Sequence, residues 1–176
     1  CGGTPARVGR STSGIAESID PGNYDHEESA VVLLDLLSAV ASNPNSLNQF
    51  PINPPATKID LIGTGVGNIV SHEAGHYLGS FHTDQTVTPP NLMDQGGNLP
   101  NIVGVGVDGT FWTGDDVDFD FGTDIFVANE GFTGVEDTLN NTAFALYMNN
   151  DLCCRDGDVD LNCDITPGDA LLAFQS

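Results

Sequence analysis

Basic side chains are scarce in this chain of 176 residues. Four Lys and Arg residues stand against 25 Asp and Glu residues, so the formal net charge is −21 at pH 7. Nucleic acids and anionic membrane surfaces are polyanions, and a chain of this charge binds them poorly. The composition therefore excludes nucleic acid as an expected partner, and it favours divalent cations as ligands for part of the carboxylates.

Long apolar runs are also missing. A membrane-spanning helix needs about 20 predominantly apolar residues, whereas the longest run here, residues 30–37, is short and contains Asp35. The sequence therefore predicts no membrane span. No signal peptide is visible and the first residue is Cys1 rather than Met, so we expect a processed or trimmed segment of a longer protein.

Cysteines are few and lie far from the histidines. Cys153 and Cys154 are adjacent, and neighbours in sequence rarely bond to each other. Disulfides that join Cys1 to one of them and Cys163 to the other would leave no free thiol. Such pairing suits an oxidising compartment, so we expect a secreted or extracellular protein, with the connectivity left open.

Three of the four histidines fall within eleven consecutive residues. Apolar positions from Gly65 to Leu78 recur at helical spacing, which predicts a helix. His72 and His76 lie four residues apart, on one helical face, where both can bind one metal ion. Glu73 lies beside them and can act as the general base for a water activated by that metal.

The third histidine, His82, can share this metal only if the helix ends before it. On an unbroken helix His82 would lie about 9 Å beyond His76, at about 1.5 Å per residue, and on another face. Gly79 can adopt the left-handed conformation that ends helices. We therefore expect a break at Gly79 and three imidazole ligands, with a fourth position open for water and substrate, as in catalytic zinc sites. The remaining histidine, His26, is expected in a loop.

The pattern H-E-x-x-H-x-x-G-x-x-H is present in full and resembles that of the metzincin zinc endopeptidases. The resemblance implies that Met93, in the turn 91–94, supports the metal site from below without binding the metal. The pair His82 and Thr83 is similar to the pappalysin-like branch. The implied activity is hydrolysis of peptide bonds in extracellular proteins, with Zn²⁺ polarising the scissile carbonyl and Glu73 taking the proton of the attacking water.

The same resemblance implies an α+β fold with a mixed sheet above the cleft, the active-site helix below it, and the Met-turn and a C-terminal helix beneath. Residues 14–18 would form an edge strand that aligns substrate by strand addition. The apolar run 30–37 fits a strand or a helix by itself, and the resemblance favours a strand. Residues 83–132 have little regular pattern and are expected to form a long functional or ion-binding loop.

A second helix is predicted over Val135–Met148 by its apolar spacing, with Thr133 and Glu136 as a capping box. We expect a catalytic domain over residues 1–150. Only 71 residues precede His72, fewer than is usual in the family, so this domain is expected to be incomplete at its N-terminal side. A small tail follows over residues 151–176.

This Asp-dense tail resembles one half-repeat of a dockerin, which implies Ca²⁺ binding and an anchoring partner or an assembly. Cys163 stands where a calcium loop usually has Gly, and an Asp ends the loop in place of Glu; a solvated acidic tail is the alternative. The oxygen ligands of the loop would come from Asp158, Asp160, Asn162, the Asp164 carbonyl and Asp169.

A second acidic stretch is a weaker calcium candidate. Its carboxylates would repel one another if they were all buried, and a cation would remove that repulsion. The alternation of Val117, Phe119 and Phe121 suggests a short strand whose opposite face carries carboxylates, and these could equally be solvated. The candidate ligands are Asp108, Asp115, Asp116, Asp118 and Asp120.

Two alternatives to a protease remain open. The chain could be a non-catalytic extracellular structural or adhesive module that retains the protease fold and binds calcium. It could also be a metal-dependent hydrolase that acts on something other than peptides. The intact Glu73 argues against the first alternative, because a structural zinc site needs no general base. The Met-turn argues against the second.

Overall fold

A computed structural model describes residues 12–25 and 27–148. Within these ranges the fold is mixed α/β, with four helices, two 3-10 turns and two small antiparallel sheets. The elements in chain order are β1 (Gly14–Ala16), β2 (Ala30–Val32), α2 (Leu34–Leu37), η1 (Leu47–Gln49), α3 (Lys58–Tyr77), α4 (Leu99–Val103), β3 (Thr123–Ile125), η2 (Ala128–Glu130), β4 (Val135–Asp137) and α5 (Thr138–Met148).

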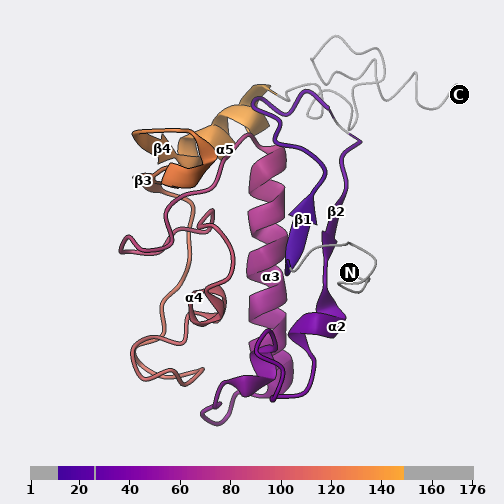
Figure 1. The fold of residues 1–176 in the computed structure, drawn as a ribbon, viewed down its shortest axis with the longest axis vertical. Helices are drawn as coiled ribbons and strands as arrows, with labels where there is room; N and C mark the ends of the chain where they lie inside the picture. Colours follow the sequence, from indigo (N-terminus) through magenta and orange to yellow (C-terminus); the bar gives the residue numbers. More distant parts are fainter. Residues whose placement is uncertain (1–11, 26, 149–176) are drawn as a thin grey trace, which may run out of the picture.

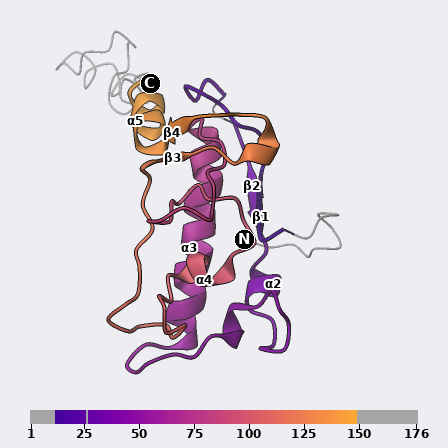
Figure 2. The ribbon, with the colours of Figure 1, turned by 60° about the vertical axis from the view of Figure 1, so that its left-hand side comes forward.

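The 20-residue helix α3 is the central element (Figure 1). Strands β1 and β2 run along one side of it, while α4 and the group formed by β3, β4 and α5 lie on the other (Figures 1 and 2). No helix in the described part of the chain has the length and apolarity needed to cross a membrane.

Helix α3 begins earlier than its apolar spacing predicts. The Thr57 hydroxyl accepts a hydrogen bond from the Asp60 backbone N–H, and the Asp60 carboxylate accepts one from the Thr57 N–H at 2.7 Å. This reciprocal capping box starts the helix at Lys58 rather than near Gly65. The cap signal was present in the sequence, but it lies before the periodic apolar stretch.

One stripe of α3 connects the core to the functional residues. Leu61, Gly65 and Ile69 are buried at successive four-residue steps, and the next position on the stripe is the buried Glu73. The stripe packs against a cluster contributed by β2, α2, η1 and the region around α4. The buried apolar members are Val32, Leu37, Leu47, Leu61, Ile69, Val103, Val105 and Phe111.

The predicted mixed sheet is not present in the described residues. The structure has two separate two-stranded antiparallel sheets instead, β1 with β2 and β3 with β4. In the first, Ile15 is opposite Val31, which confirms a strand within 14–18. The run 30–37 divides into β2 and α2, so neither a single strand nor a single helix describes it.

The predicted helix over Val135–Met148 is correct only from Thr138 onward, because its first three residues form β4. The proposed capping box of Thr133 and Glu136 is therefore wrong: Glu136 lies in the strand, opposite Asp124. At the start of α5 the Asp137 carboxylate, and not a side chain at position 133, accepts a hydrogen bond from the helix: the Asn140 N–H donates to it at 3.0 Å.

The segment 83–132 is irregular for most of its length, as predicted, but it contains α4, β3 and η2. The alternating residues 117–121 do not form a strand. Their one ladder contact is an isolated bridge between Asn91 and Asp120. The alternation of apolar side chains is therefore not enough to predict a strand here, because no neighbouring strand pairs with this stretch.

Two glycines one half-turn apart in α3 should respond in opposite ways to alanine. A Cβ at Gly65 would contact Leu47 Cδ1 and lie 3.0 Å from Val103 Cγ1, whereas a Cβ at Gly67 would meet no atom within 4 Å. We expect Gly67→Ala to stabilise the fold by about 0.5–1 kcal/mol, because alanine is the better helix former. Gly65→Ala should destabilise it by about 1–3 kcal/mol through overpacking.

Urea unfolding followed by circular dichroism measures both changes. Equal stabilisation by the two substitutions would show that Gly65 does not lie against the core.

Candidate metal centre

Helix α3 ends where the sequence predicts. Gly79 has a φ of +90°, its N–H donates to the His76 carbonyl, and the Ser80 N–H donates to the Gly75 carbonyl, each at 2.9 Å. This pair of bonds is the Schellman motif, which needs a left-handed residue and so favours glycine. A Cβ at Gly79 would also lie 2.6 Å from Pro21 Cα. After Gly79 the backbone therefore turns away from the axis of α3, and the following residues run back toward the end of the helix.

The return brings the three histidines together. Their candidate ligand atoms lie within 4.8 Å of one another. The ring centroids of His72, His76 and His82 are separated by 4.8–5.2 Å. This is the only group of three or more His, Cys, Asp or Glu side chains in residues 12–25 and 27–148 that could hold a metal ion.

Each imidazole is held through its Nδ1 atom by an oxygen from a different element. His72 Nδ1 donates to the Leu92 carbonyl and His76 Nδ1 to the Ser80 carbonyl, both at 2.8 Å. A carbonyl can only accept, so these two rings carry the proton on Nδ1 and keep the Nε2 lone pair free. His82 Nδ1 lies 2.6 Å from Glu130 Oε1 in η2. Such contacts orient metal-binding histidines in known sites.

Burial keeps the two helical histidines neutral. Desolvation lowers the pKa of His72 from 6.5 to about 3, with further lowering by His76, against an opposing effect of the Leu92 carbonyl. Desolvation also lowers the pKa of His76. Protons therefore do not compete for these nitrogens near neutral pH, which is the state that metal binding requires.

Glu73 is buried beside the histidines, with 5% of its surface exposed. Burial raises the pKa of its carboxyl to about 7, against an opposing hydrogen bond from the Ala16 backbone. Strand β1 approaches α3 closely here because residue 14 is glycine: a Cβ at Gly14 would lie 2.6 Å from Ile69 Cγ2 and would overlap the Glu73 carboxylate. A carboxyl with a pKa near neutral can both accept and release a proton.

The predicted Met-turn lies against α3. Met93 is fully buried, and a Cβ at Gly75 would overlap its sulfur. The turn is fixed by its own polar side chains: Met93 N–H donates to Asn91 Oδ1 at 2.9 Å, and Asn91 N–H donates to Asp94 Oδ2 at 3.1 Å. The Leu92 carbonyl that holds His72 belongs to the same turn, so the turn supports the site directly.

The segment that carries His82 is clamped on both sides. Thr83 N–H donates to the Met93 carbonyl at 2.9 Å, and the His82 carbonyl accepts from Val127 N–H at 3.2 Å. Glu136 Oε1 accepts from Phe81 N–H at 2.9 Å, across 55 positions of sequence. Sequence reasoning missed Glu136 and Glu130 as supports of the site, because no local pattern marks a contact with so distant a partner.

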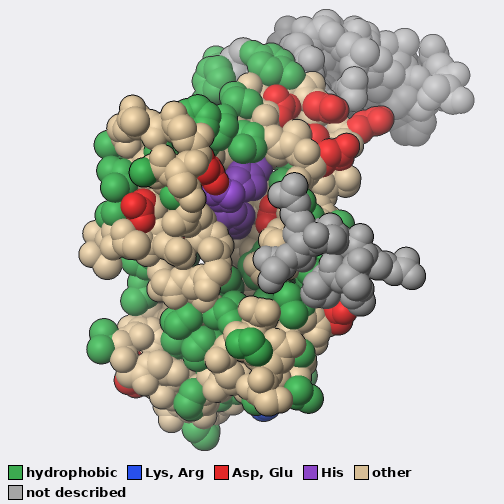
Figure 3. Space-filling model, viewed as in Figure 1, with side chains coloured by type: hydrophobic (Ala, Val, Ile, Leu, Met, Phe, Trp, Pro, Cys, Tyr) green, Lys and Arg blue, Asp and Glu red, His purple; other side chains and the backbone are tan. Residues whose placement is uncertain are grey.

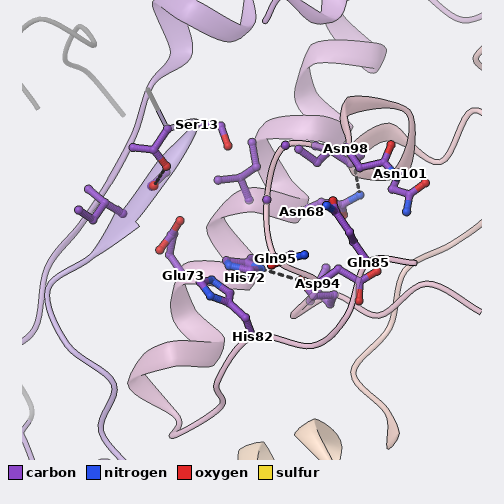
Figure 4. Close-up of a pocket in the computed structure, with 18 of the residues that line it drawn as sticks. Ser13, Asn68, His72, Glu73, His82, Gln85, Asp94, Gln95, Asn98 and Asn101 are labelled. Carbon is purple, nitrogen blue, oxygen red and sulfur yellow. Dashed lines mark hydrogen bonds between the residues drawn. The ribbon is translucent and has the colours of Figure 1, made fainter. Parts of the chain in front are cut away.

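The histidines line a cleft of about 650 Å³. Figure 3 shows their side chains at the bottom of a hollow on one face of the molecule. Residues of β1 and Glu73 form one wall, and residues from the end of the Met-turn to α4 form the other (Figure 4). An open cleft of this size beside three potential ligands leaves room for a substrate.

The structure does not gather the weaker calcium candidates into a group of metal-ligating side chains within the described residues. Asp115 accepts from the Val107 and Asp108 N–H groups at 2.8 and 3.0 Å, and Asp116 accepts from the Trp112 N–H at 2.6 Å. These carboxylates thus stabilise the turns of their own loop. Calcium binding there stays a prediction. His26, the four cysteines and the calcium loop 158–169 lie outside the described residues.

Removing the η2 carboxylate should weaken metal binding. We expect Glu130→Ala to lower the affinity for a divalent transition metal about 10–100-fold, because His82 would lose the contact that orients its ring. Asn129→Ala, an exposed neighbour in the same turn, is the matched control and should change little. Competition with a chromophoric chelator measures both affinities. Equal affinities would show that Glu130 plays no part in the site.

The metal-free protein should show opposing pH effects from the two buried groups. Between pH 4.5 and 6.5 the unfolded state binds more protons at His72, whose pKa falls from 6.5 to about 3 on folding, and the folded state binds more at Glu73, whose pKa rises from 4.5 to about 7. The first effect makes the free energy of unfolding rise with pH, and the second makes it fall.

Glu73→Gln removes the second effect alone. Between pH 4.5 and 6.5 the variant's unfolding free energy should therefore rise more steeply with pH than that of the wild type, by up to about 1.4 kcal/mol per pH unit. Urea titrations in the presence of a chelator give both slopes. Parallel curves would contradict a raised pKa at Glu73.

Comparisons with known proteins do not assign a function to this site, so its geometry is the evidence for its role. No protein-family model, no curated protein and no solved structure matches this chain. The histidine cluster alone does not identify a metzincin, since three converging imidazoles occur in several classes of metal site. What the structure establishes is a set of three histidines that could hold a metal ion, beside a buried carboxyl and an open cleft.

Proposed function

We propose that the chain is the catalytic region of a zinc-dependent endopeptidase. The observation that carries this proposal is the convergence of three oriented imidazoles with the buried Glu73 at the bottom of an open cleft. A structural zinc site is usually closed by a fourth protein ligand. Here the fourth neighbour is a carboxyl group whose raised pKa suits proton transfer.

The donor set fits zinc and does not fit calcium or magnesium. Imidazole nitrogens suit zinc and its transition-metal neighbours, whereas calcium and magnesium take oxygen ligands. His72, His76 and His82 would hold the ion through Nε2, since each Nδ1 is engaged. When bound, zinc supplies Lewis acidity, which polarises a carbonyl and lowers the pKa of water.

Glu73 acts as the proton carrier in this proposal. Its carboxylate takes the proton of the water that attacks the scissile carbonyl and then delivers it to the leaving amine nitrogen. The Ala16 backbone favours the ionised form of this carboxyl. Burial raises the pKa of Glu73 to about 7 in the metal-free protein, whereas a nearby cation would lower it toward the ionised form that accepts a proton from water.

Strand β1 offers a means of binding a peptide. It pairs with β2 along one edge, and its residues Gly14, Ile15 and Ala16 line the cleft along the other. An extended substrate could add to that edge as a further strand, with main-chain hydrogen bonds that are independent of its sequence. The strand packs against α3 at Ile69 and Glu73, so a peptide on it would lie near the histidines.

A secreted location and calcium binding by the C-terminal tail complete the proposal. The acidic composition and the four cysteines favour an extracellular protein. The resemblance to metzincins gains support from the helix stop at Gly79 and from the burial of Met93 beneath the helix.

The test combines metal content with proteolysis. Purified wild type should contain about one zinc per chain by mass spectrometry and cleave an unfolded protein substrate. His82→Ala should lose the zinc. Glu73→Gln should keep the zinc and lose cleavage by at least about a hundredfold, as expected for a general base.

Zinc in the wild type without any Glu73-dependent cleavage would indicate the non-catalytic module instead. No zinc in the freshly purified protein would remove the basis for the proposal.

A further inference from the structure

The wall of the cleft opposite β1 carries an unusual concentration of carboxamides. Five Asn and Gln side chains line it, drawn from α3, the segment after His82, the end of the Met-turn and α4 (Figure 4). They are Asn68, Gln85, Gln95, Asn98 and Asn101.

Most of their hydrogen-bonding capacity is unused. The Asn98 side chain, although it precedes α4, makes no capping bond, and the Gln95 and Asn101 carboxamides have no partner among the described residues. Gln85 Oε1 is buried without a partner. Asn68 donates to the Ile102 carbonyl at 2.8 Å, which leaves its own oxygen free. The wall therefore presents both donors and acceptors to whatever enters the cleft.

Acidic side chains would find no cationic counterpart on this wall. The one Lys or Arg in the described residues is Lys58, about 21 Å from His72 along α3 at 1.5 Å per residue. The carboxylates that line the cleft are Glu73, which faces β1, and Asp94. Both Asp94 oxygens are occupied, by Thr83 and by the Asn91 N–H. A negative charge placed here would lose water without gaining a partner of opposite charge.

We propose that these carboxamides select a glutamine or asparagine residue of the substrate, beside the bond that is cleaved. This inference rests on the proposed endopeptidase function. Apolar side chains of Ile69, Leu92 and Ile102 line the same cleft and can pack against the methylene stem of the residue. The carboxamides then exchange hydrogen bonds with its amide end, a neutral planar group that offers two N–H donors and a carbonyl acceptor.

A site of this kind discriminates against close analogues for separate reasons. Leucine or methionine would fill the space but leave the carboxamides of the wall unpaired. Glutamate has the shape of glutamine but would bring an unpaired charge into a cleft of an already acidic protein. Lysine carries donors and no acceptor, so it would leave the N–H groups of the wall unpaired.

The experiment is digestion of a complex peptide library by the zinc-loaded protein, with every cleavage site identified by mass spectrometry. We expect Gln and Asn to be enriched at one position next to the cleaved bond, and Asp, Glu, Lys and Arg to be depleted there. Two peptides that differ only by Gln or Met at that position should differ about tenfold in kcat/KM, the effect of one or two unpaired hydrogen bonds.

The matched variant is Gln95→Met with Asn98→Leu, which keeps side-chain size and removes both carboxamides. It should bring the ratio of kcat/KM for the Gln and Met peptides close to one, while the zinc content stays at that of the wild type. Cleavage with an apolar or charged preference, or a variant with unchanged preference, would overturn this inference and leave the endopeptidase standing. A library without any cleaved peptide would refute the endopeptidase itself, and this inference with it.

Discussion

Three imidazoles must reach one point although two of them belong to a helix and the third follows its end. The rest of the structure depends on how the chain meets that constraint. A straight helix would carry His82 away from His76, so the backbone has to reverse within three residues. The left-handed Gly79 allows the reversal, and the carbonyls freed at the end of α3 are satisfied by the Schellman bonds. One of the residues in this reversal, Ser80, then holds His76 through its own carbonyl.

The reversal alone would leave His82 on a loose loop. Its position is fixed by polar contacts with elements far along the chain: Glu130 on the ring and Glu136 on the Phe81 backbone. Glu136 is 4% exposed and burial raises its pKa, so this clamp carries a desolvation cost that a surface residue would avoid. The buried Glu136 carboxyl accepts the Phe81 backbone N–H, a role that a neighbouring strand would fill in a regular sheet.

The sequence predicts the centre of the site better than its supports. The positions of His72, His76 and Gly79 follow from helix geometry and from the conformational range of glycine, which are local properties. Strand β4 does not follow from local rules, because the apolar spacing that begins at Val135 is equally compatible with a helix. The pairing of these residues with β3 makes them a strand, and contacts between distant segments leave no periodic signal in the sequence. The start of α3 is the opposite case, since the capping box at Thr57 could be recognised in the sequence.

The chemistry of the site is tied to its burial. The same desolvation that keeps His72 and His76 neutral raises the pKa of Glu73, so one low-dielectric pocket sets the protonation of both the candidate ligands and the proposed proton carrier. A metal ion bound to the folded chain and not to the unfolded one would add stability in proportion to the logarithm of its concentration. Folding and metal loading would then be coupled most strongly in the segment from Gly79 to Thr83. That segment carries the candidate ligand His82 and is held both by hydrogen bonds and by the contacts of the Phe81 ring with Phe126 and Phe132.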